Sequence, residues 1–366
     1  MAYYMVLRRF EMNKNMDFNT SDAHISHRLH LNESDSNNLL NLNHVFLNEF
    51  KKISIYPDPG NTDLKNKISY HCKVSSDMVV LGNGIDEIIL LLSLTFLKNK
   101  KTILTSEATF PGYETSAKIV GGNVIYVPLN DMRCSIANYQ KNIANDVSLA
   151  YLCNPHNPTG SIISLDEVIN FIEVMNVKGV IPVIDEAYIQ FSDENKNSIL
   201  KYIANGGRAI VLRTFSKAYG LAGLRVGFAV GPKDLIHAVS LTALALPFRI
   251  NRFAQRMASE VLASDILSIN VRTVREFIST IELSFNKSKV KYIPSSTNFI
   301  CFKPPMGNTD FLIKAEKFGA MVRDCSLFGL PGWIRASVSN KKDVDCLLFL
   351  LDMTSFKENQ SGDVNE

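Results

Sequence analysis

The chain has 366 residues, of which 46% are hydrophobic and 20% are charged. This length suggests two domains, and the apolar content is enough to fill a large core without disulfides or structural metals. With 39 basic against 36 acidic residues and a net charge of +3, the sequence lacks the basic surface of a nucleic-acid-binding protein.

The cysteines and the apolar segments indicate the compartment. Six cysteines are scattered without the paired spacing of a zinc site, which is typical of reduced thiols in the cytosol. The first 15 residues lack the apolar core of a signal peptide. The longest apolar run, residues 88–97, is too short to cross a membrane. We therefore expect a soluble cytoplasmic protein that binds neither a membrane nor a metal.

The N-terminal region is polar. Residues 1–30 are rich in asparagine and show no periodic pattern, which predicts an N-terminal arm or a disordered tail. His24, His27 and His30 follow one another at a three-residue spacing that a metal site could use. We favour a polar tail that contains histidines, because no cysteine stands near them to complete a site.

Short β-rich runs alternate with amphipathic stretches between residues 60 and 245. The predicted strands are residues 102–105, 123–127, 149–152, 180–184, 209–212 and 226–230. The helices predicted among them are residues 85–98, 165–176 and 233–245. Strands and helices that alternate over this length predict an α/β fold with a mostly parallel sheet and helices on both faces.

The pattern changes near residue 251. A long helical stretch at 252–284 precedes short strands near 298–302 and 333–338 and a last helix at about 342–353. This order predicts a second, smaller α+β domain. We therefore divide the chain into an arm (1–30), a large ligand-binding domain (31–250) and a small domain (251–366), to which the N-terminal segment also contributes.

Two motifs at predicted strand ends each have a structural and a functional interpretation. In LGNGIDE, glycines precede an apolar helix, whose free N–H groups and dipole can hold a phosphate; the alternative is a plain turn and helix cap. In TFPGY, Phe110 can cover a flat ring or simply pack within its loop. Taken alone, neither motif favours the functional interpretation.

The motif CNPHNPTG places two Asn-Pro pairs in a short loop. Proline fixes its own φ and restricts the residue before it, so the loop holds Asn157 stiffly. A merely structural turn seldom needs two fixed asparagines. We therefore favour a functional role, in which the amide of Asn157 faces a ligand.

The motif VIDEAYIQF ends an apolar strand with Asp185 and Glu186, and Tyr188 follows three residues after Asp185. An acid at the end of a buried strand is costly unless it is paired. A protonated ring nitrogen would be a suitable partner. The alternative is an aspartate that caps the next helix.

The motif TFSKAYGLAGLRVGF brings Thr214, Ser216, Lys217 and Arg225 to a loop after another strand. A partly desolvated lysine near arginines has a lowered pKa, which makes its amine available for Schiff-base chemistry. Two hydroxyls and an arginine can hold a phosphate. A lone loop lysine is ordinarily a solvated charge, and that is the alternative.

The five motifs together decide what none decides alone. Ligands in open α/β sheets bind at the carboxyl ends of strands, where all five motifs fall. They supply a phosphate cup, a ring cover, a polar clamp, an acid for a ring nitrogen and an amine nucleophile. This set of groups predicts a site for pyridoxal 5′-phosphate.

From about residue 28 to 355 the chain resembles the fold-type I pyridoxal-phosphate aminotransferases of classes I and II. The family's motifs stand here in order as YPDPG, GNGIDE, TFPGY, NPHNPTG, DEAYIQF, RTFSKAYGLAGLRVGF, TNFICF and VRDCSLFGLPGWIRASV. The similarity is greatest to the histidinol-phosphate aminotransferases. The resemblance implies a homodimeric enzyme that transfers an amino group between an amino acid or amino-alcohol phosphate and a 2-oxo acid.

The resemblance also implies a role for each matching residue on the cofactor. Lys217 would form the Schiff base and then move a proton at the substrate's α-carbon. Asp185 would pair with the ring nitrogen, and Phe110 would stack on the ring. Tyr188 and Asn157 would bind the ring's 3-oxygen. The phosphate would be held by Gly84, Ile85, Asp86, Thr214, Ser216, Arg225 and Tyr56, the last from the partner subunit.

The substrate side follows the family less closely. By resemblance, Arg335 would bind the substrate's α-carboxylate and Arg323 its distal anionic group. Relatives carry an Asn-Glu-Asn-Pro-Tyr-like run whose tyrosine helps hold the substrate's phosphate. Here HLNESDSNNLL keeps Asn32, a candidate substrate ligand, but has neither the proline nor the tyrosine. His156 stands where asparagine is usual, either as a loop residue or as a donor that faces the substrate.

These departures, with Arg249 and Arg252 in PFRINRFAQ, bear on the substrate and leave alternatives open. One is decarboxylation of a phosphorylated amino acid, as in the similar threonine-phosphate decarboxylases. Another is elimination or cyclisation on an amino acid such as a hydroxyarginine. DEAYIQF and FSKAYGLAGLRVG favour the transaminase. A non-catalytic pyridoxal-binding regulator is the alternative from another class, and it would carry a DNA-binding domain where this chain has a short tail.

Overall fold

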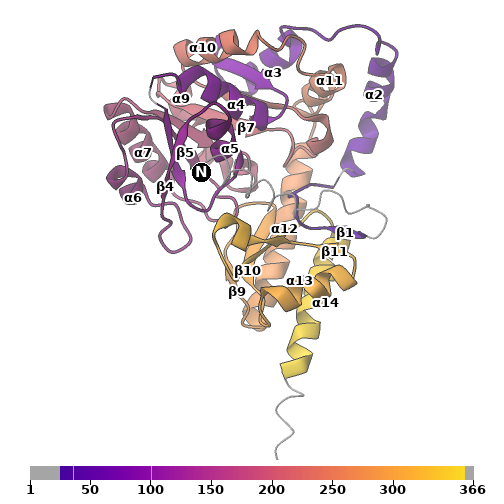
Figure 1. The fold of residues 1–366 in the computed structure, drawn as a ribbon. Coiled ribbons are helices and arrows are strands. Elements are labelled where there is room, and N and C mark those ends of the chain that lie inside the picture. Colours follow the sequence, from indigo (N-terminus) through magenta and orange to yellow (C-terminus); the bar gives the residue numbers. More distant parts are fainter. Residues whose placement is uncertain (1–24, 36, 100, 359–366) are drawn as a thin grey trace, which may run out of the picture.

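The structure is a computed structural model that describes residues 25–35, 37–99 and 101–358 (Figure 1). Most of the predicted arm, His24 and Ser36 of the altered N-terminal run lie outside these residues. The described chain builds a seven-stranded sheet from strands within residues 79–230 and a four-stranded sheet from strands within residues 291–337. In the part of the chain that the structure describes, no helix combines the length and the apolar character that a membrane span needs.

The large sheet is mostly parallel, as the sequence predicts. Its strands are β2 (Val79–Gly82), β3 (Thr102–Ser106), β4 (Asn123–Val127), β5 (Val147–Cys153), β6 (Ile181–Asp185), β7 (Ile210–Thr214) and β8 (Gly227–Val230). They lie in the order β2-β8-β7-β6-β5-β3-β4, and β8 is antiparallel to both of its neighbours. The strand β2, four residues directly before the GNGIDE turn, was not among the predicted strands.

Helices cover both faces of this sheet because the central strands are apolar on both sides. Ile103, Leu149 and Leu212 pack with α4 (Ile85–Phe96), α5 (Gly112–Ile119) and α10 (Lys233–Ala243). Their neighbours Leu104 and Ala150 face the opposite way, toward α3 (Thr62–Cys72), α7 (Leu165–Val177) and α11 (Arg252–Val261). The start of α7 is fixed by a capping box between Ser164 and Glu167.

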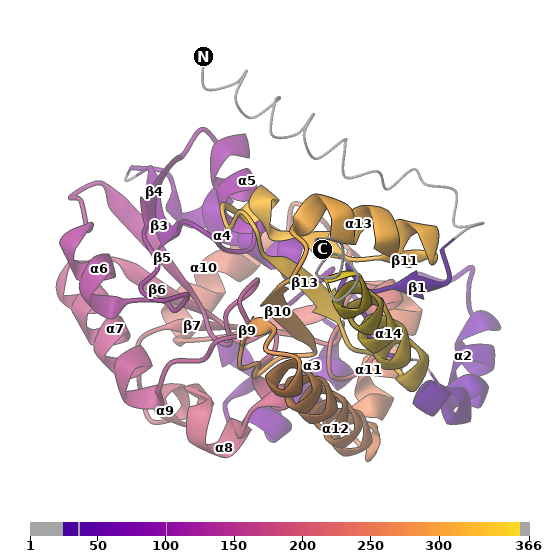
Figure 2. The same cartoon turned by 90° about the horizontal axis from the view of Figure 1, so that it is seen from below.

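The smaller sheet is antiparallel, with the order β12-β13-β10-β9. Its strands are β9 (Lys291–Ile293), β10 (Phe299–Lys303), β12 (Arg323–Asp324) and β13 (Ile334–Ser337), and α12 (Ile266–Lys287), α13 (Asn308–Lys317) and α14 (Lys341–Glu358) surround it (Figure 2). The predicted helix at 252–284 is two helices, because the chain turns between α11 and α12 at residues 262–265.

The N-terminal segment joins this smaller part, since β1 (His27–Arg28) pairs in parallel with β11 (Ala320–Met321). The domain boundaries at residues 30 and 250 stay predictions. The remaining short elements are η2 (Asn37–Leu42), α2 (Asn43–Phe50), η3 (Ser76–Met78), α6 (Ile136–Lys141), η4 (Ile189–Phe191), α8 (Glu194–Asn197), α9 (Leu200–Ala204), η5 (Ala222–Leu224) and η6 (Cys325–Phe328).

Candidate active site

The carboxyl ends of three adjacent parallel strands bring the predicted site residues together. Asp185 ends β6 and lies opposite Cys153, the last residue of β5, from which the Asn157 loop continues. Thr214 ends β7, the next strand, and Lys217 follows three residues later. Parallel strands end at the same edge of a sheet, so motifs far apart in the sequence meet here.

Lys217 is held by backbone carbonyls and forms no ion pair with any described residue. Its Nζ donates hydrogen bonds to the carbonyl oxygens of Leu31 at 3.1 Å and Asn32 at 3.0 Å. Burial lowers the pKa of the Lys217 amine to about 8, and the positive charge of Arg335 acts in the same direction. An amine with this pKa is partly neutral near physiological pH and can act as a nucleophile or a base.

Asp185 is a buried acid that pairs with no cation among the described residues. The Tyr113 hydroxyl donates to its Oδ2 at 2.5 Å, and the Ala187 N–H donates to its Oδ1 at 3.0 Å. Burial raises the pKa of Asp185 to about 6 despite these donors. The bond between Tyr113 and Asp185 was not predicted from the sequence, although Tyr113 belongs to the TFPGY motif.

Asn157 and Tyr188 face the same region from two different loops. The Asn157 Oδ1 accepts a hydrogen bond from Arg335 Nη1 at 2.6 Å, which leaves the amide N–H groups of Asn157 to donate elsewhere. The Tyr188 hydroxyl accepts from Asn32 Nδ2 at 2.9 Å. Burial raises the pKa of Tyr188, so the phenol keeps its proton. Both residues can therefore donate to an anionic ligand oxygen.

The start of α4 and the loop after β7 build a small cationic cup. Gly84 has a φ of +78°, and a Cβ on it would lie 2.6 Å from Arg225 Nη2, so glycine permits this close approach. Arg225 pairs with Asp86 at 2.8 Å and lies 3.5 Å from Ser216 Oγ. Thr214 Oγ1 accepts from the Ser216 N–H at 3.1 Å. Free N–H groups at the first turn of α4, including that of Ile85, complete the anion-binding groups.

Phe110 lies beside the group that binds Asp185. Its ring meets the ring of Tyr113 edge-on, with 5.6 Å between centroids. A Cβ at Gly112 would lie 2.3 Å from the Phe110 ring, so glycine is needed for this packing. The Phe110 ring is thus fixed next to the acid-bearing end of the sheet.

Two arginines stand directly opposite each other on neighbouring strands. Arg323 of β12 and Arg335 of β13 are register partners, and among the described residues no carboxylate pairs with either. Burial lowers the pKa of both guanidinium groups, to about 10 for Arg323, on which the positive charge of Arg335 acts in the same direction. Like charges opposite each other are destabilising, so this pair fits an anion that lies between or upon them.

Asn32 and His156 both make contacts within the protein, which argues against direct substrate binding by either side chain. Asn32 is buried, and its amide bonds Tyr188 and Ser337. His156 is also buried, with Nδ1 2.9 Å from Thr159 Oγ1 and Nε2 3.4 Å from Ser106 Oγ. Burial lowers the pKa of His156 to about 4, so the ring is neutral. These contacts favour the loop-residue interpretation of His156.

Arg249 and Arg252 also make internal contacts. Arg249 pairs with Glu87 at 2.9 Å. Arg252 binds Glu49 at 3.0 Å and the carbonyl oxygens of Ile55 at 3.3 Å and Tyr56 at 3.0 Å. Arg252 therefore anchors the YPDPG segment, in which the Tyr56 side chain is 75% exposed.

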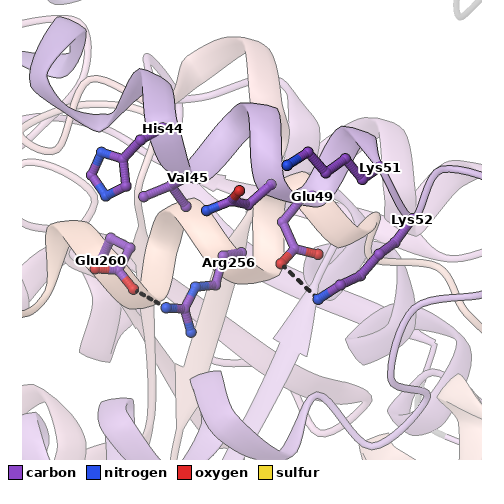
Figure 3. Close-up of a pocket in the computed structure, with 8 residues that line it drawn as sticks. His44, Val45, Glu49, Lys51, Lys52, Arg256 and Glu260 are labelled. Carbon is purple, nitrogen blue, oxygen red and sulfur yellow. Dashed lines mark ion pairs between the residues drawn. The ribbon is translucent and has the colours of Figure 1, made fainter.

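A separate surface pocket of about 520 Å³ lies between α2 and α11 (Figure 3). Glu49 lies 3.7 Å from Lys52 there, and Arg256 pairs with Glu260 at 2.7 Å. None of the predicted site residues lines it. Its lining is His44, Val45, Asn48, Glu49, Lys51, Lys52, Arg256 and Glu260.

The arrangement at the strand ends fits pyridoxal phosphate group by group. The buried, cation-free carboxylate of Asp185 suits a protonated ring nitrogen. The cup around Gly84, Ser216 and Arg225 suits a phosphate. A side chain at Gly84 would clash with Arg225, so glycine keeps the cup open. Lys217, with its lowered pKa and no acidic partner, suits a bond to an aldehyde.

Comparisons with known proteins agree with this fit. The family model described as aminotransferase class I and II matches residues 18–349. A histidinol-phosphate aminotransferase from Caldanaerobacter subterraneus subsp. tengcongensis is 34% identical over 300 residues, which cover 81% of this chain and 83% of that protein. The crystal structure of a histidinol-phosphate aminotransferase from Sinorhizobium meliloti, in complex with pyridoxal-5′-phosphate, has a TM-score of 0.81 at 24% identity and covers 89% of this chain and 90% of that one.

A structure with a different activity is similar as well. The L-threonine-O-3-phosphate decarboxylase from Porphyromonas gingivalis has a TM-score of 0.73 at 19% identity, with coverage of 90% of this chain and 99% of that one. Both solved structures are less than 25% identical to this chain, so their likeness shows the fold. The fold is therefore shared by enzymes that break different bonds.

Proposed function

Because the chain belongs to the aminotransferase class I and II family, we propose that its amino donor is an amino acid or amino-alcohol phosphate, with histidinol phosphate as the first compound to test. The chain is an aminotransferase that depends on pyridoxal 5′-phosphate. The acceptor in the proposed exchange is a 2-oxo acid. Histidinol phosphate enters as a candidate through the relatives that act on it.

The observation that carries this proposal is the arginine pair. Arg323 and Arg335 face each other without a carboxylate partner among the described residues, and burial weakens the hydration of both. Arg335 is also placed by the Asn157 amide and the ring of Phe299, 5.2 Å from its guanidinium carbon. A substrate with an anionic end would relieve the repulsion, and bidentate contacts to carboxylate or phosphate are the strong ones. We assign the α-carboxylate of the oxo acid to Arg335 and the distal anion of either substrate to Arg323.

In the proposed reaction, pyridoxal phosphate supplies the electron-withdrawing ring that stabilises negative charge at the substrate's α-carbon. Lys217 would hold the cofactor and, once freed by the substrate's amine, its Nζ would take the proton from the α-carbon of the amino donor and pass it to the cofactor, and in the return half of the reaction it would place a proton on the α-carbon of the oxo acid. Asp185 keeps a negative charge opposite the ring nitrogen and so favours its protonated state. Tyr188 and Asn157 donate hydrogen bonds to the ring oxygen, and Phe110 covers the ring.

We also propose a homodimer. Exposed apolar side chains are concentrated in two segments, residues 46–56 and 241–248, which we call the apolar band: Phe46, Leu47, Phe50, Ile53, Ile55, Tyr56, Leu241, Leu244, Leu246 and Phe248. Exposed apolar surfaces of this kind mark association sites. Tyr56 lies in the band, stacked on Phe248 with 4.6 Å between ring centroids. A second copy that covers the band could receive Tyr56 at its own phosphate cup.

The six free cysteines, five of them buried, fit the proposed cytoplasmic location, where thiols stay reduced. This proposal is tested by locating the tagged full-length chain in fractionated cells. Recovery of the chain in the soluble cell extract with reduced thiols is the expected result, whereas secretion or disulfide formation would contradict it.

A donor screen tests the proposed substrate. The purified holoenzyme is supplied with 2-oxoglutarate and, in separate reactions, histidinol phosphate, O-phosphothreonine, histidinol and phenylalanine, and the products are identified by mass. We expect a keto product from histidinol phosphate and much slower reaction of histidinol, which lacks the distal anion. Carbon dioxide from O-phosphothreonine would instead support the decarboxylase, and loss of water without amino transfer would support elimination or cyclisation.

A further inference from the structure

Asn32 uses every polar atom it has within the site. Its N–H donates to Ser337 Oγ at 2.7 Å, and its carbonyl accepts from Lys217 Nζ at 3.0 Å and Asn298 Nδ2 at 3.2 Å. Its side-chain amide spans Ser337 and Tyr188. The residue is buried, with a φ of +54° in the left-handed region that asparagine tolerates better than most residues. Each polar atom of Asn32 is therefore already bonded within the protein.

The hydrogen bonds of Ser337 fix which way the Asn32 amide points. Ser337 Oγ accepts from the Asn32 N–H, and its single proton is donated to Asn32 Oδ1 at 3.1 Å. The amide oxygen therefore faces Ser337, and the amide nitrogen faces Tyr188. The reversed amide would leave the Ser337 proton without an acceptor, because Asn32 Oδ1 is the one acceptor that this proton has among the described residues.

This orientation also determines where the Tyr188 proton can go. The Tyr188 oxygen accepts from Asn32 Nδ2 at 2.9 Å, so its own proton cannot be donated back to that nitrogen. Burial raises the pKa of Tyr188, so the proton stays on the phenol. The Tyr188 O–H must therefore point away from Asn32, and the carbonyl of the same asparagine holds Lys217.

We propose that Asn32 is a positioning residue that directs the Tyr188 proton toward the ring oxygen of the cofactor, with Ser337 fixing the Asn32 amide. The inference rests on the proposed role of Tyr188 as a donor to that oxygen. Asn32 belongs to the altered N-terminal run. The sequence suggested that it contacts the substrate, whereas in this proposal it acts on the cofactor site through Tyr188. Asn32 and Tyr188 are far apart in the sequence. The hydrogen bond between their side chains is what lets Asn32 act on the Tyr188 proton.

The test is a pH titration of the visible absorbance of the bound cofactor. A donor to the ring oxygen stabilises negative charge there and so favours the deprotonated form, which means that losing the donor raises the titration midpoint. Asn32→Asp replaces the amide donor by an acceptor that attracts the Tyr188 proton to itself. We expect Asn32→Asp to raise the midpoint by about one pH unit more when Tyr188 is present than in a Tyr188→Phe background.

The comparison of the two backgrounds removes the direct effect of the added charge, which acts in both. Ser337→Ala, a neutral change, should raise the midpoint by a smaller amount because the amide is then free to turn. An equal rise from Asn32→Asp in both backgrounds would overturn the proposal. Should Asn32→Asp fail to retain cofactor, Ser337→Ala decides: a midpoint equal to that of the unaltered enzyme overturns the proposal. The midpoint is read without turnover, so failure of the proposed substrate leaves this result unaffected.

Discussion

The cofactor side of the site and its substrate side are built in different ways. The cofactor side, formed by the GNGIDE turn, Asp185 and the segment from Thr214 to Arg225, comes from the ends of β2, β6 and β7 in one mostly parallel sheet. The substrate side consists of Arg323 and Arg335 of the small sheet, and Arg335 also donates to the carbonyl oxygen of His30 in the N-terminal segment at 2.7 Å. Only the cofactor side rests on a single rigid framework.

The two sides also differ in how their charges are balanced. On the cofactor side Arg225 already has a partner in Asp86, 2.8 Å away. On the substrate side Arg323 and Arg335 have no carboxylate partner among the described residues. A ligand that binds the substrate side therefore supplies the missing charge, whereas the cup needs mainly shape and N–H donors. Changes on the two sides should consequently affect different measurements.

The largest effect is expected at Lys217, which binds the cofactor and also acts on the substrate's α-carbon. Lys217→Ala should lower kcat by about 10⁴-fold or more, because both the covalent anchor and the base for the α-carbon are lost. Borohydride should fix the cofactor to the peptide that contains residue 217 in the unaltered enzyme and leave the variant unlabelled. A variant that retained full turnover would contradict the assignment of the whole cofactor side.

Asp185→Asn should lower kcat by about 10³-fold, because a neutral amide no longer favours a protonated ring nitrogen. The same change should raise the stability of the cofactor-free protein near neutral pH. The folded pKa of Asp185 is raised to about 6 from 3.8, so the folded state binds the proton more tightly and loses stability as pH rises from about 4 to 6.

Ionisation of Asp185 should lower the free energy of unfolding of the cofactor-free protein by an amount on the order of 2–3 kcal/mol above pH 6. Urea unfolding of the cofactor-free protein at pH 4.5 and pH 7.5 measures it, with Asp185→Asn as the matched variant that lacks the titration. The difference in unfolding free energy between Asp185→Asn and the unaltered chain should grow in favour of the variant as pH rises. A difference that stays constant with pH would mean that Asp185 is not desolvated as described.

The sequence predicted the cofactor side better than the substrate side for a physical reason. GNGIDE, DEAYIQF and FSKAYGLAGLRVG each follow a strand, and a parallel sheet brings such strand ends together without further information. Asn32 meets Tyr188 across 156 residues of chain, through a contact that no local pattern encodes. Tyr113 was overlooked similarly, since its bond to Asp185 depends on how α5 packs against β6. The fold class and the positions of β3 to β8 were predictable from periodicity, whereas β2 and the split between α11 and α12 were not.

Changes at the arginine pair should separate substrates from one another. Arg335→Ala should lower kcat/KM by about 10²-fold for every carboxylate-bearing substrate, because a buried charge-assisted contact is lost. Arg323→Ala should do so only for substrates with a distal anion, so histidinol phosphate should lose more than histidinol. The measurement for each variant is the kcat/KM for the substrate with the distal anion divided by that for its partner without it, such as histidinol phosphate and histidinol. Arg249→Ala is the control, because Arg249 pairs with Glu87. An equal loss for both members of a pair would remove the distal role from Arg323.

The smallest effect is expected at Tyr56, whose role depends on a second subunit. Tyr56→Phe removes one hydroxyl from a cup that retains Arg225, Ser216 and helix N–H groups, so cofactor affinity should fall by about tenfold or less. Because Tyr56 is exposed on its own chain, the loss should be repaired in trans. Mixing Tyr56→Phe with Lys217→Ala chains creates hybrid dimers in which one site combines the native Lys217 with the native Tyr56. Equilibrium titration of cofactor should then show sites of native affinity in the mixture and none in either variant alone, whereas a mixture that merely averages the two variants would place the Tyr56 hydroxyl outside the partner's cup.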